Sequence, residues 1–344
     1  MGIFNHNNRV CLIPNVSGVG GMVSFRGKLI KGLAERGISV SFDLADTPYA
    51  AILVIGGTRD IPGLWRARRR GIRVVQRLDG MNWIHRRRRT GWRHYARAEY
   101  GNIILSVIRS RLTDHIVYQS EFSHRWWERV YGVGKIPWQV VYNGVDLESY
   151  TPTGEGKIPE DHIRIILVEG AIAGGYEWGL ETAIKMAERV STTHRHRIEL
   201  MVVGRVSESL QRECKEKAEV QVNFIGQVPA EKVPGLDRSA HLLYAADVNA
   251  ACPNSVIEAL ACGLPVVAFD TGALSELIKQ DAGRLVPYGG DPWRLDPPDI
   301  DALAEAVNNI INNQVGFRAA ARKRAEEVFG LDLMVEGYLD ALNI

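Results

Sequence analysis

The chain alternates between short apolar runs and helix-like segments along most of its length, and this alternation limits the folds open to it. Arg9–Pro14 indicates a strand, and a turn with the sequence SGVGG (17–21) leads into a helix over 22–35. Strands that alternate with helices are typical of a parallel sheet with helices on both faces. The other elements expected in the first half are strands at 38–43, 51–55, 72–78, 114–119 and 138–142, and helices at 62–70, 96–111 and 121–131.

The pattern repeats after TPTGEGKIPEDH (151–162), a segment rich in Gly, Pro and charge that we interpret as a domain boundary. A chain of 344 residues is long enough for about two domains. We therefore predict two Rossmann-like, doubly wound α/β domains that face a central cleft, with ligands at the carboxyl ends of the strands. The second half is expected to hold strands at 163–168, 198–203, 221–225, 240–244 and 264–269, and helices at 178–190, 207–217, 255–262, 273–279, 299–313 and 316–342.

The net charge of +2 conceals an uneven distribution along the chain. Residues 1–150 hold 23 Lys and Arg against 11 Asp and Glu, and residues 151–344 hold 19 against 29. Such a split supports two domains with different partners. No window approaches ~18 uninterrupted apolar residues, and MGIFNHNNRV lacks the features of a secretion signal, so we expect a cytoplasmic protein without a membrane span. The cysteines form no CxxC pair and the histidines no HxxxH cluster, so no metal site is expected.

Most of the positive excess lies in 59–111, where 15 arginines stand against three acids. Three interpretations are open: a solvated face, a nucleic-acid surface, or contact with an anionic membrane or acceptor. The enzyme-like architecture around the segment favours a membrane on its cytoplasmic side or an anionic acceptor, and makes nucleic acid the less favoured partner. The segment interleaves Trp83, Trp92, Tyr95 and Tyr100 with Arg86–Arg89, Arg93 and Arg97.

The stretch CPNSVIEALACGLPVVAFDTG (252–272) places a carboxylate, Glu258, in a segment built like a buried helix and strand. Ser255 followed by Glu258 fits a capping box, and Gly263 with Pro265 would end the helix. A helix start with exposed amides is also a site for anions. Both interpretations of Glu258 are open at this point.

Residues 253–278, PNSVIEALACGLPVVAFDTGALSELI, resemble the donor-site signature of the family-4 retaining glycosyltransferases, which have the GT-B fold. VVYNGVDLESYTP (140–152) is similar to the segment that joins their two domains. RAEEVFGLDLMVEGYLDAL (324–342) is similar to the helix that crosses back to the first domain. The resemblance implies an acceptor domain over 1–150, a nucleotide-sugar donor domain over 151–325 and the crossing helix over 326–344.

The resemblance also implies roles for individual residues. Glu258 would bind the ribose of the donor nucleotide, because a carboxylate accepts two hydrogen bonds from adjacent hydroxyls. The amides of Asn254, Ser255 and Val256 would hold the diphosphate or the sugar, and Gly204 and Val228 would border the base. The turn with Gly18, Gly20 and Gly21 would face the diphosphate from the first domain, although a tight strand-to-helix turn explains these glycines equally well.

The sequence departs from the family pattern at charged positions. The first Glu of the family motif falls on Ala250, and Asp247 replaces it only if the loop is rearranged. The Arg and Lys that neutralise the leaving diphosphate fall on Ala171 or Ile172 and on Trp178. Arg205, or the amides of Gly174 and Gly175, would have to supply this stabilisation.

In the first domain, the fourth strand ends with RLDG (77–80). We predict that Asp79 contacts the acceptor or the sugar and is a catalytic residue together with Glu258 and Arg205, with His85 as a second acceptor contact. A turn formed by the Asp-Gly pair is the alternative for Asp79. Asp299-Ile300-Asp301 resembles the DxD motif of metal-dependent sugar transferases, but acids that cap a helix explain it better.

These observations predict a glycosyltransferase that moves a sugar, hexosyl by resemblance, from a nucleotide-diphosphate donor to a glycan or lipid-linked acceptor. The resemblance implies retention at the anomeric carbon and a place in polysaccharide biosynthesis, and the residues indicate no need for a metal or other cofactor. Ala250, Ala171 and Trp178 motivate the alternatives, which are a non-catalytic protein that binds sugar nucleotides or glycans and a GT-B sugar-nucleotide epimerase.

Overall fold

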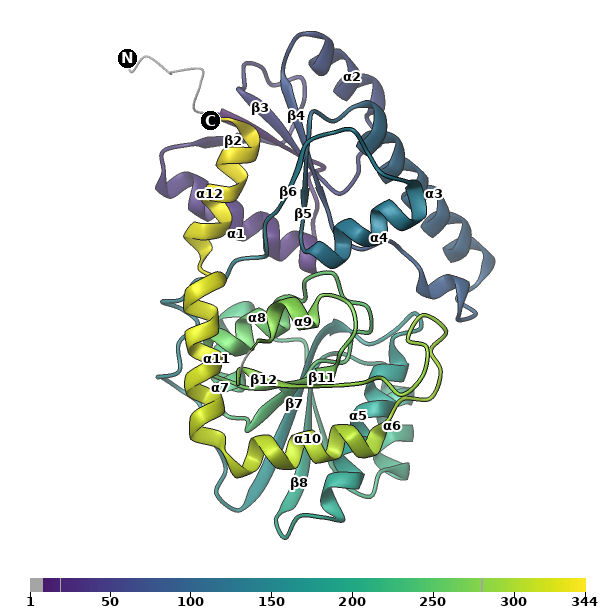
Figure 1. The fold of residues 1–344 in the computed structure, drawn as a ribbon, viewed down its shortest axis with the longest axis vertical. Helices are drawn as coiled ribbons and strands as arrows, with labels where there is room; N and C mark the ends of the chain where they lie inside the picture. The colour runs from purple at the N-terminus through teal and green to yellow at the C-terminus, as the bar shows by residue number, and fades with distance from the viewer. Residues whose placement is uncertain (1–8, 19, 280) are drawn as a thin grey trace. The chain divides into compact units, whose positions relative to one another are not determined.

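The computed structural model describes residues 9–18, 20–279 and 281–344. The chain forms two compact units (Figure 1). The first unit comprises residues up to 86, 90–144 and 330–344, and the second comprises 87–89 and 145–329. The chain thus leaves the first unit at 144 and returns to it at 330, where the sequence places these changes after residues 150 and 325.

The first unit is built on a six-stranded parallel sheet with the order β2-β1-β3-β4-β5-β6. Connections between parallel strands need crossovers, and helices supply most of them here. The strands are β1 (Arg9–Ile13), β2 (Ser39–Ser41), β3 (Ala51–Ile55), β4 (Arg73–Leu78), β5 (His115–Tyr118) and β6 (Trp138–Val140). The helices are α1 (Gly21–Glu35), α2 (Ile61–Arg69), α3 (Trp92–Arg111), α4 (Glu121–Tyr131) and α12 (Leu331–Leu342), with a 3₁₀ turn at Ile84–Arg86.

Alternate side chains of the central strands point to two separate hydrophobic cores, as the period of two in a strand requires. On one face, strand residues such as Leu12 and Leu53 pack with α1 and α12. On the other face, Cys11 and Ile52 pack with α2 and the end of α3. Helix α12 lies very close to α1, because Gly32 leaves room for Val335; a Cβ at residue 32 would stand 2.3 Å from the Val335 side chain.

The second unit is built on another six-stranded parallel sheet, with the order β12-β11-β10-β7-β8-β9. Strands β7, β8 and β10 supply apolar side chains to a core shared with α5, α10 and α11. The strands are β7 (His162–Ala171), β8 (Arg197–Arg205), β9 (Gln221–Gly226), β10 (Leu242–Tyr244), β11 (Val266–Phe269) and β12 (Gly283–Val286). The helices are α5 (Glu177–Ser191), α6 (Glu208–Lys217), α7 (Val233–Arg238), α8 (Asn254–Ala261), α9 (Leu274–Leu277), α10 (Ile300–Asn312) and α11 (Gln314–Val328).

The predicted pair of parallel, doubly wound α/β units is confirmed, and the corrections concern short or interrupted elements. The expected helix over 316–342 is two helices separated at Phe329–Gly330, where the Phe329 carbonyl accepts a hydrogen bond from the Val145 amide (2.8 Å). Helix α7 and strand β12 are additional, since VPGLDR contains Pro and Gly and GRLV is only four residues long. No helix in the part of the chain that the structure describes is long and apolar enough to cross a bilayer.

Candidate functional site

The order in which the chain adds strands to the second sheet reverses between β7 and β10. From β7 the chain proceeds outward through β8 and β9, and it then continues on the other side of β7 through β10, β11 and β12. In open α/β sheets, ligands bind beside the carboxyl ends of the strands at such a reversal. We therefore expect a ligand site at the segments that follow β7 and β10.

The carboxyl end of β7 is irregular in a way that redirects a side chain. The register with β8 shifts between Val168 and Ala171, so Glu169 and Gly170 lie in a β-bulge. Gly204 of β8 permits this close approach: its φ is 137°, and a Cβ there would stand 1.9 Å from the Glu169 carbonyl oxygen. Gln227, in the turn after β9, donates from Nε2 to the Gly170 carbonyl (3.1 Å). The ends of β8 and β9 thus both contact the bulge of β7 at Glu169 and Gly170.

Glu169 and Asp247 form an acidic pair across this reversal. Glu169 lies two residues before the end of β7, and Asp247 follows β10, the neighbouring strand. Burial and, to a smaller extent, the negative charge of Asp247 together raise the pKa of Glu169 to about 8. Burial also raises the pKa of Asp247 to about 7. Carboxylates with strongly raised pKa values in such a position mark a functional-site candidate. Glu169 was not predicted as a site residue, although an acid directly after the apolar run 163–168 was a signal in the sequence.

Helix α8 begins at this edge without a side-chain cap. Its N-cap is Pro253 and its first residue is Asn254, so the predicted capping box at Ser255 is wrong: Ser255 lies inside the first turn. The first amides of a helix have no intrahelical partner, and the positive end of the helix dipole favours anions. The amides of Asn254, Ser255 and Val256 therefore keep the arrangement that the anion-site prediction needs. The predicted end of the helix is confirmed, with Gly263 at φ 67°.

Glu258 lies one helical turn after Asn254 and is half-buried. Asp237 of α7 is its acidic neighbour and is 1% exposed. Burial, followed by the charge of Glu258, raises the pKa of Asp237 well above its usual value. Neither oxygen of the Asp237 carboxyl has a hydrogen-bond partner among the described residues. The buried Asp237 carboxyl thus binds its proton more tightly than an exposed aspartate does.

The groups predicted to stabilise the charge of the diphosphate differ in exposure and in the contacts that they already make. Arg205 is the last residue of β8, beside Ala171, and its side chain is exposed. Gly175 donates its amide to Glu177 Oε2 (2.8 Å), so a carboxylate of the protein already occupies one predicted amide. Trp178, which holds the family's Lys position, stacks on Tyr288 and packs on the hydrophobic core. Gly174 has φ 70°, a conformation that favours glycine.

Ala250 cannot simply be exchanged for the family's acid. It is 5% exposed, and its carbonyl accepts a hydrogen bond from the Ala273 amide (2.9 Å). Gly272 packs directly on it, since a Cβ at residue 272 would stand 2.5 Å from the Ala250 carbonyl oxygen. The acid of this loop is Asp247 instead. Val228, predicted beside the base, is half-buried just after the turn that contacts Gly170.

In the first unit, Gly18 and Gly20 precede α1, with φ values of 103° and 138°, and Gly21 is its first residue. A Cβ at Gly18 or Gly20 would meet nothing within 4 Å among the described residues, so these glycines serve the backbone conformation. Val19 lies outside the described residues. The prediction that this turn faces a diphosphate stays a prediction.

Asp79 follows β4, at the carboxyl edge of the first sheet. Its carbonyl accepts hydrogen bonds from Ser123 Oγ (2.9 Å) and Trp127 Nε1 (2.7 Å), which fix the backbone. Burial raises the pKa of its side chain, and the nearby Arg77 charge opposes this rise. Arg77, which the sequence analysis did not single out, is 1% exposed and stacks on Phe25 at 3.9 Å. Asp79 stays a prediction as an acceptor contact.

His85 is 5% exposed and is held by its own unit. Its Nε2 lies 2.8 Å from Glu99 Oε1, and Arg86 binds the same carboxylate. The Arg86 hydrogen bonds outweigh burial and, with His85, lower the pKa of Glu99 to about 2. This arrangement gives His85 a structural role, and its predicted contact with an acceptor would require the pair with Glu99 to open.

Asp299 caps α10 by accepting a hydrogen bond from the Ala302 amide (2.9 Å), and Asp301 pairs with Arg189 (2.5 Å). The capping interpretation of this DxD sequence is therefore confirmed. Across the described ranges, no group of three His, Cys, Asp or Glu side chains is arranged to hold a metal ion.

Comparison with known families matches residues 164–313 to Glycosyl transferases group 1. An uncharacterized glycosyltransferase of Methanocaldococcus jannaschii is 25% identical over 52% of this chain and 46% of its own length. The phosphatidyl-myo-inositol mannosyltransferase of Mycolicibacterium smegmatis is 28% identical over 60% of this chain and 51% of its own. The chain thus spans about half the length of these curated relatives.

Solved structures match nearly the whole chain. The sucrose-phosphate synthase of Thermosynechococcus elongatus superposes with a TM-score of 0.76 and 16% identity, covering 98% of both chains. Anabaena Alr3699/HepE, solved with UDP and glucose, superposes with a TM-score of 0.72 and 15% identity over 98% of this chain and all of the other. The fold of both units is therefore that of the GT-B glycosyltransferases.

Proposed function

We propose that this protein is a GT-B glycosyltransferase that transfers a sugar, hexosyl by its resemblance, from a nucleotide-diphosphate donor to an acceptor hydroxyl. One observation carries the proposal: the uncapped start of α8 lies at the carboxyl edge of the second sheet, one turn before Glu258. The amides would bind the diphosphate, and Glu258 would bind the ribose hydroxyls. The match of 164–313 to Glycosyl transferases group 1 covers this helix.

The chemistry that we propose is displacement on one face of the sugar, with retention. The bond between the anomeric carbon and the diphosphate oxygen breaks, and a bond to the acceptor oxygen forms on the same face. The acceptor proton passes to the departing phosphate oxygen. Amides at the start of α8 and the exposed Arg205 would stabilise the developing phosphate charge without a metal ion.

The acidic pair gives this donor site a pH dependence. With pKa values raised to about 8 and about 7, Glu169 and Asp247 carry two negative charges together only in alkaline solution. Charges of the same sign repel a diphosphate. We therefore expect donor affinity to fall as the pH rises from about 6 to about 9. Below this range the protonated pair donates hydrogen bonds to sugar or phosphate oxygens.

The acceptor surface that we propose is the exposed part of α3 in the first unit. Trp92, Tyr95 and Tyr100 are 77%, 47% and 56% exposed. Arg93 lies over the Trp92 ring at 5.5 Å, and Arg97 lies between the aromatic residues in sequence. Aromatic and basic side chains together suit a lipid-linked or anionic glycan at the cytoplasmic face of an anionic membrane.

The experiment is thermal stability with UDP, GDP, ADP and dTDP for the wild type and Glu258→Gln. A nucleotide at about 100 times its dissociation constant stabilises the folded state by about 2.7 kcal/mol. We expect one nucleotide to raise the melting temperature, and Glu258→Gln to remove the increase. The matched control is Glu216→Gln, an exposed acid near the end of α6, which keeps the increase. If no nucleotide raises the melting temperature of the wild type, the proposal fails.

A second candidate function is a sugar-nucleotide-binding protein without transferase activity. The buried Ala250 and the core position of Trp178 favour it, because both remove charge that the family uses in catalysis. Release of nucleoside diphosphate from the donor, with or without acceptor, distinguishes the transferase from the binding protein. Interconversion of the donor sugar without nucleotide release identifies the epimerase.

A further inference from the structure

The first unit has a hollow at the amino-terminal edge of its sheet, opposite the edge where β4 ends. Its volume is about 690 Å³, within the usual range for small-molecule sites. It lies between the second half of α2, the start of β4 and the end of α3. The charged and aromatic side chains that line it are Trp65, Arg68, Arg69, Arg73, Arg111 and Asp114.

The one acid of this lining, Asp114, has both carboxylate oxygens engaged within the fold. Oδ1 accepts a hydrogen bond from Arg68 Nε (3.0 Å), and Oδ2 accepts one from the Val74 amide (3.0 Å). Asp114 therefore balances Arg68 and ties α2 to the start of β4. It leaves the charges of the other three arginines unbalanced within the lining.

Two of the four guanidinium groups are held by neutral carbonyls. Arg68 also donates to the Arg111 carbonyl (2.7 Å), and Arg73 Nε donates to the Ala341 carbonyl (2.7 Å). A carbonyl fixes the direction of a guanidinium without cancelling its charge. Arg73 is therefore oriented, and still positive, at the wall of the hollow.

Arg69 and Arg111 provide the donors that the fold does not use. The Arg69 guanidinium lies over the Trp65 ring at 4.9 Å, a contact that uses the face of the group and leaves its N–H edge available. The exposed Arg111 side chain makes no hydrogen bond or ion pair with another described residue. Arginine near the end of a helix often serves only to complement the helix dipole. That explanation accounts for Arg68, but not for a stacked Arg69 facing a hollow.

We propose that this hollow binds a ligand through one or two phosphate groups, held by Arg69, Arg73 and Arg111 beside Trp65. Guanidinium groups bind phosphate oxygens through paired, charge-assisted hydrogen bonds. The site is separate from the proposed donor site, which lies in the other unit. It therefore does not rest on the proposed function. The phosphate belongs either to a soluble molecule or to a lipid headgroup, and the experiment separates these sources.

The experiment is calorimetric titration of the full chain with inorganic pyrophosphate. The variants are Arg69→Gln combined with Arg111→Gln, and the control is Arg66→Gln, an exposed arginine of α2 that does not line the hollow. Tryptophan emission, compared with Trp65→Phe, reports binding at this place. We expect the double variant to weaken binding at least tenfold and the control by less than twofold. Circular dichroism and the melting temperature establish that each variant folds.

A second titration uses vesicles of phosphatidylglycerol, with phosphatidylcholine vesicles for comparison. Pyrophosphate binding that the double variant abolishes supports a soluble ligand. Binding only to phosphatidylglycerol vesicles, also lost in the double variant, supports a lipid headgroup. The proposal is overturned if neither probe binds, or if the double variant and Arg66→Gln bind both probes like the wild type. Because the stabilisation by nucleotide is measured separately, failure here leaves the proposed function standing.

Discussion

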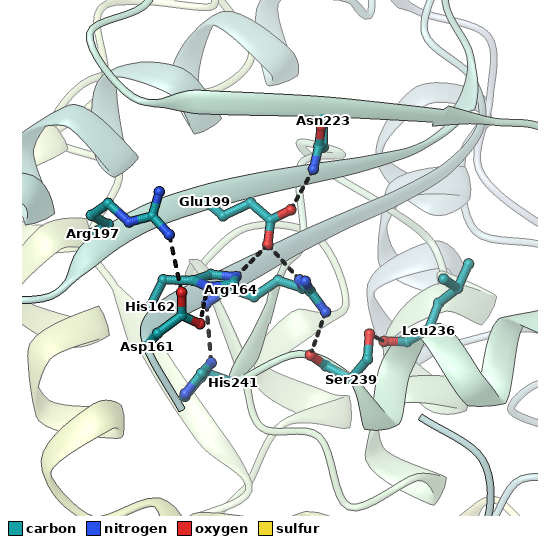
Figure 2. A network of polar contacts seen from close by, with 9 residues as sticks. All are labelled: Asp161, His162, Arg164, Arg197, Glu199, Asn223, Leu236, Ser239 and His241. Carbon is teal, nitrogen blue, oxygen red and sulfur yellow. Dashed lines mark hydrogen bonds and ion pairs between the residues drawn. The ribbon is translucent and has the colours of Figure 1, made fainter. Parts of the chain in front are cut away.

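Carboxylates at the two edges of the second sheet have different surroundings, and their pKa values shift in opposite directions. At the amino-terminal edge, Glu199 lies within a network of partners (Figure 2): Arg164 Nε at 2.5 Å, His162 Nε2 at 2.7 Å and Asn223 Nδ2 at 2.5 Å. Burial alone would raise the pKa of Glu199, but the hydrogen bonds from Arg164, Asn223 and His162 lower it below its usual value. At the carboxyl edge, burial raises the pKa values of Glu169 and Asp247, and the charge of Asp247 adds to the rise at Glu169.

The difference separates a structural network from a candidate site. Every carboxylate oxygen of Glu199 has a donor, and Arg164 is anchored in turn by the Ser239 carbonyl (3.2 Å), so the network fixes the start of three strands (Figure 2). At the carboxyl edge, no cation of the described residues is among the groups that set the pKa values of Glu169 and Asp247. Such imbalance costs stability, and it is found where a ligand supplies the missing partners.

The largest expected loss of stability comes from disrupting the Glu199 network at the amino-terminal edge. Arg164→Met leaves Glu199, whose side chain is 4% exposed, without its main cation. We expect a loss of about 3 kcal/mol in the free energy of unfolding, measured by denaturation in urea. The control is Arg197→Met, whose partner Asp161 and own side chain are 70% and 71% exposed, and it should leave stability nearly unchanged. Equal losses in the two variants would show that the Glu199 network is no stronger than a surface pair.

The next effect tests the bulge at the carboxyl edge. Gly204→Ala forces a side chain into a backbone with φ 137° and against the Glu169 carbonyl oxygen. We expect a loss of about 2 kcal/mol. Gly226→Ala is the matched control, since its φ is 80° but a Cβ there meets nothing within 4 Å, and it should cost about 1 kcal/mol. If Gly204→Ala costs no more than the control, β7 and β8 do not need this close approach.

The smallest expected effect is a gain in stability, from a substitution of Glu169 at alkaline pH. In the native state Glu169 binds a proton more tightly than in the unfolded chain, so its contribution to stability falls as the pH rises from about 4.5 through about 8. Glu169→Gln removes this loss. We expect the variant to be more stable than the wild type at pH 9 by about 1 kcal/mol, and to approach it at pH 5. Melting temperatures across this range test the sign, and a destabilised variant at pH 9 would contradict the raised pKa.

The sequence predicted those parts of the molecule that depend on local pattern. Apolar runs such as AILVI (51–55) specify buried strands, and Gly263 ends α8 as expected, because these features depend on neighbours in the chain. The prediction at Ser255 was wrong because the helix begins two residues earlier, with Pro253 as an N-cap that makes no side-chain hydrogen bond.

The acidic pair and the arginine hollow were beyond such reasoning. Glu169 and Asp247 meet only because β7 and β10 are neighbours in the sheet, although 77 residues separate their aligned positions Ile165 and Leu242. Arg111 and Arg69 lie in one hollow because α3 and α2 pack on the same face of the first sheet. Both sites bring together residues that are distant in the sequence. Their composition depends on strand pairing and helix packing, which local sequence patterns do not specify.

The return of the chain to the first unit sets the order in which the molecule is completed during synthesis. Helix α12 supplies Met334, Val335, Tyr338 and Leu342 to the core around α1, and these residues are translated after every other element of the first unit. The whole second unit, 145–329, emerges before them. Part of the apolar face of the first sheet therefore stays uncovered until α12 has been synthesised.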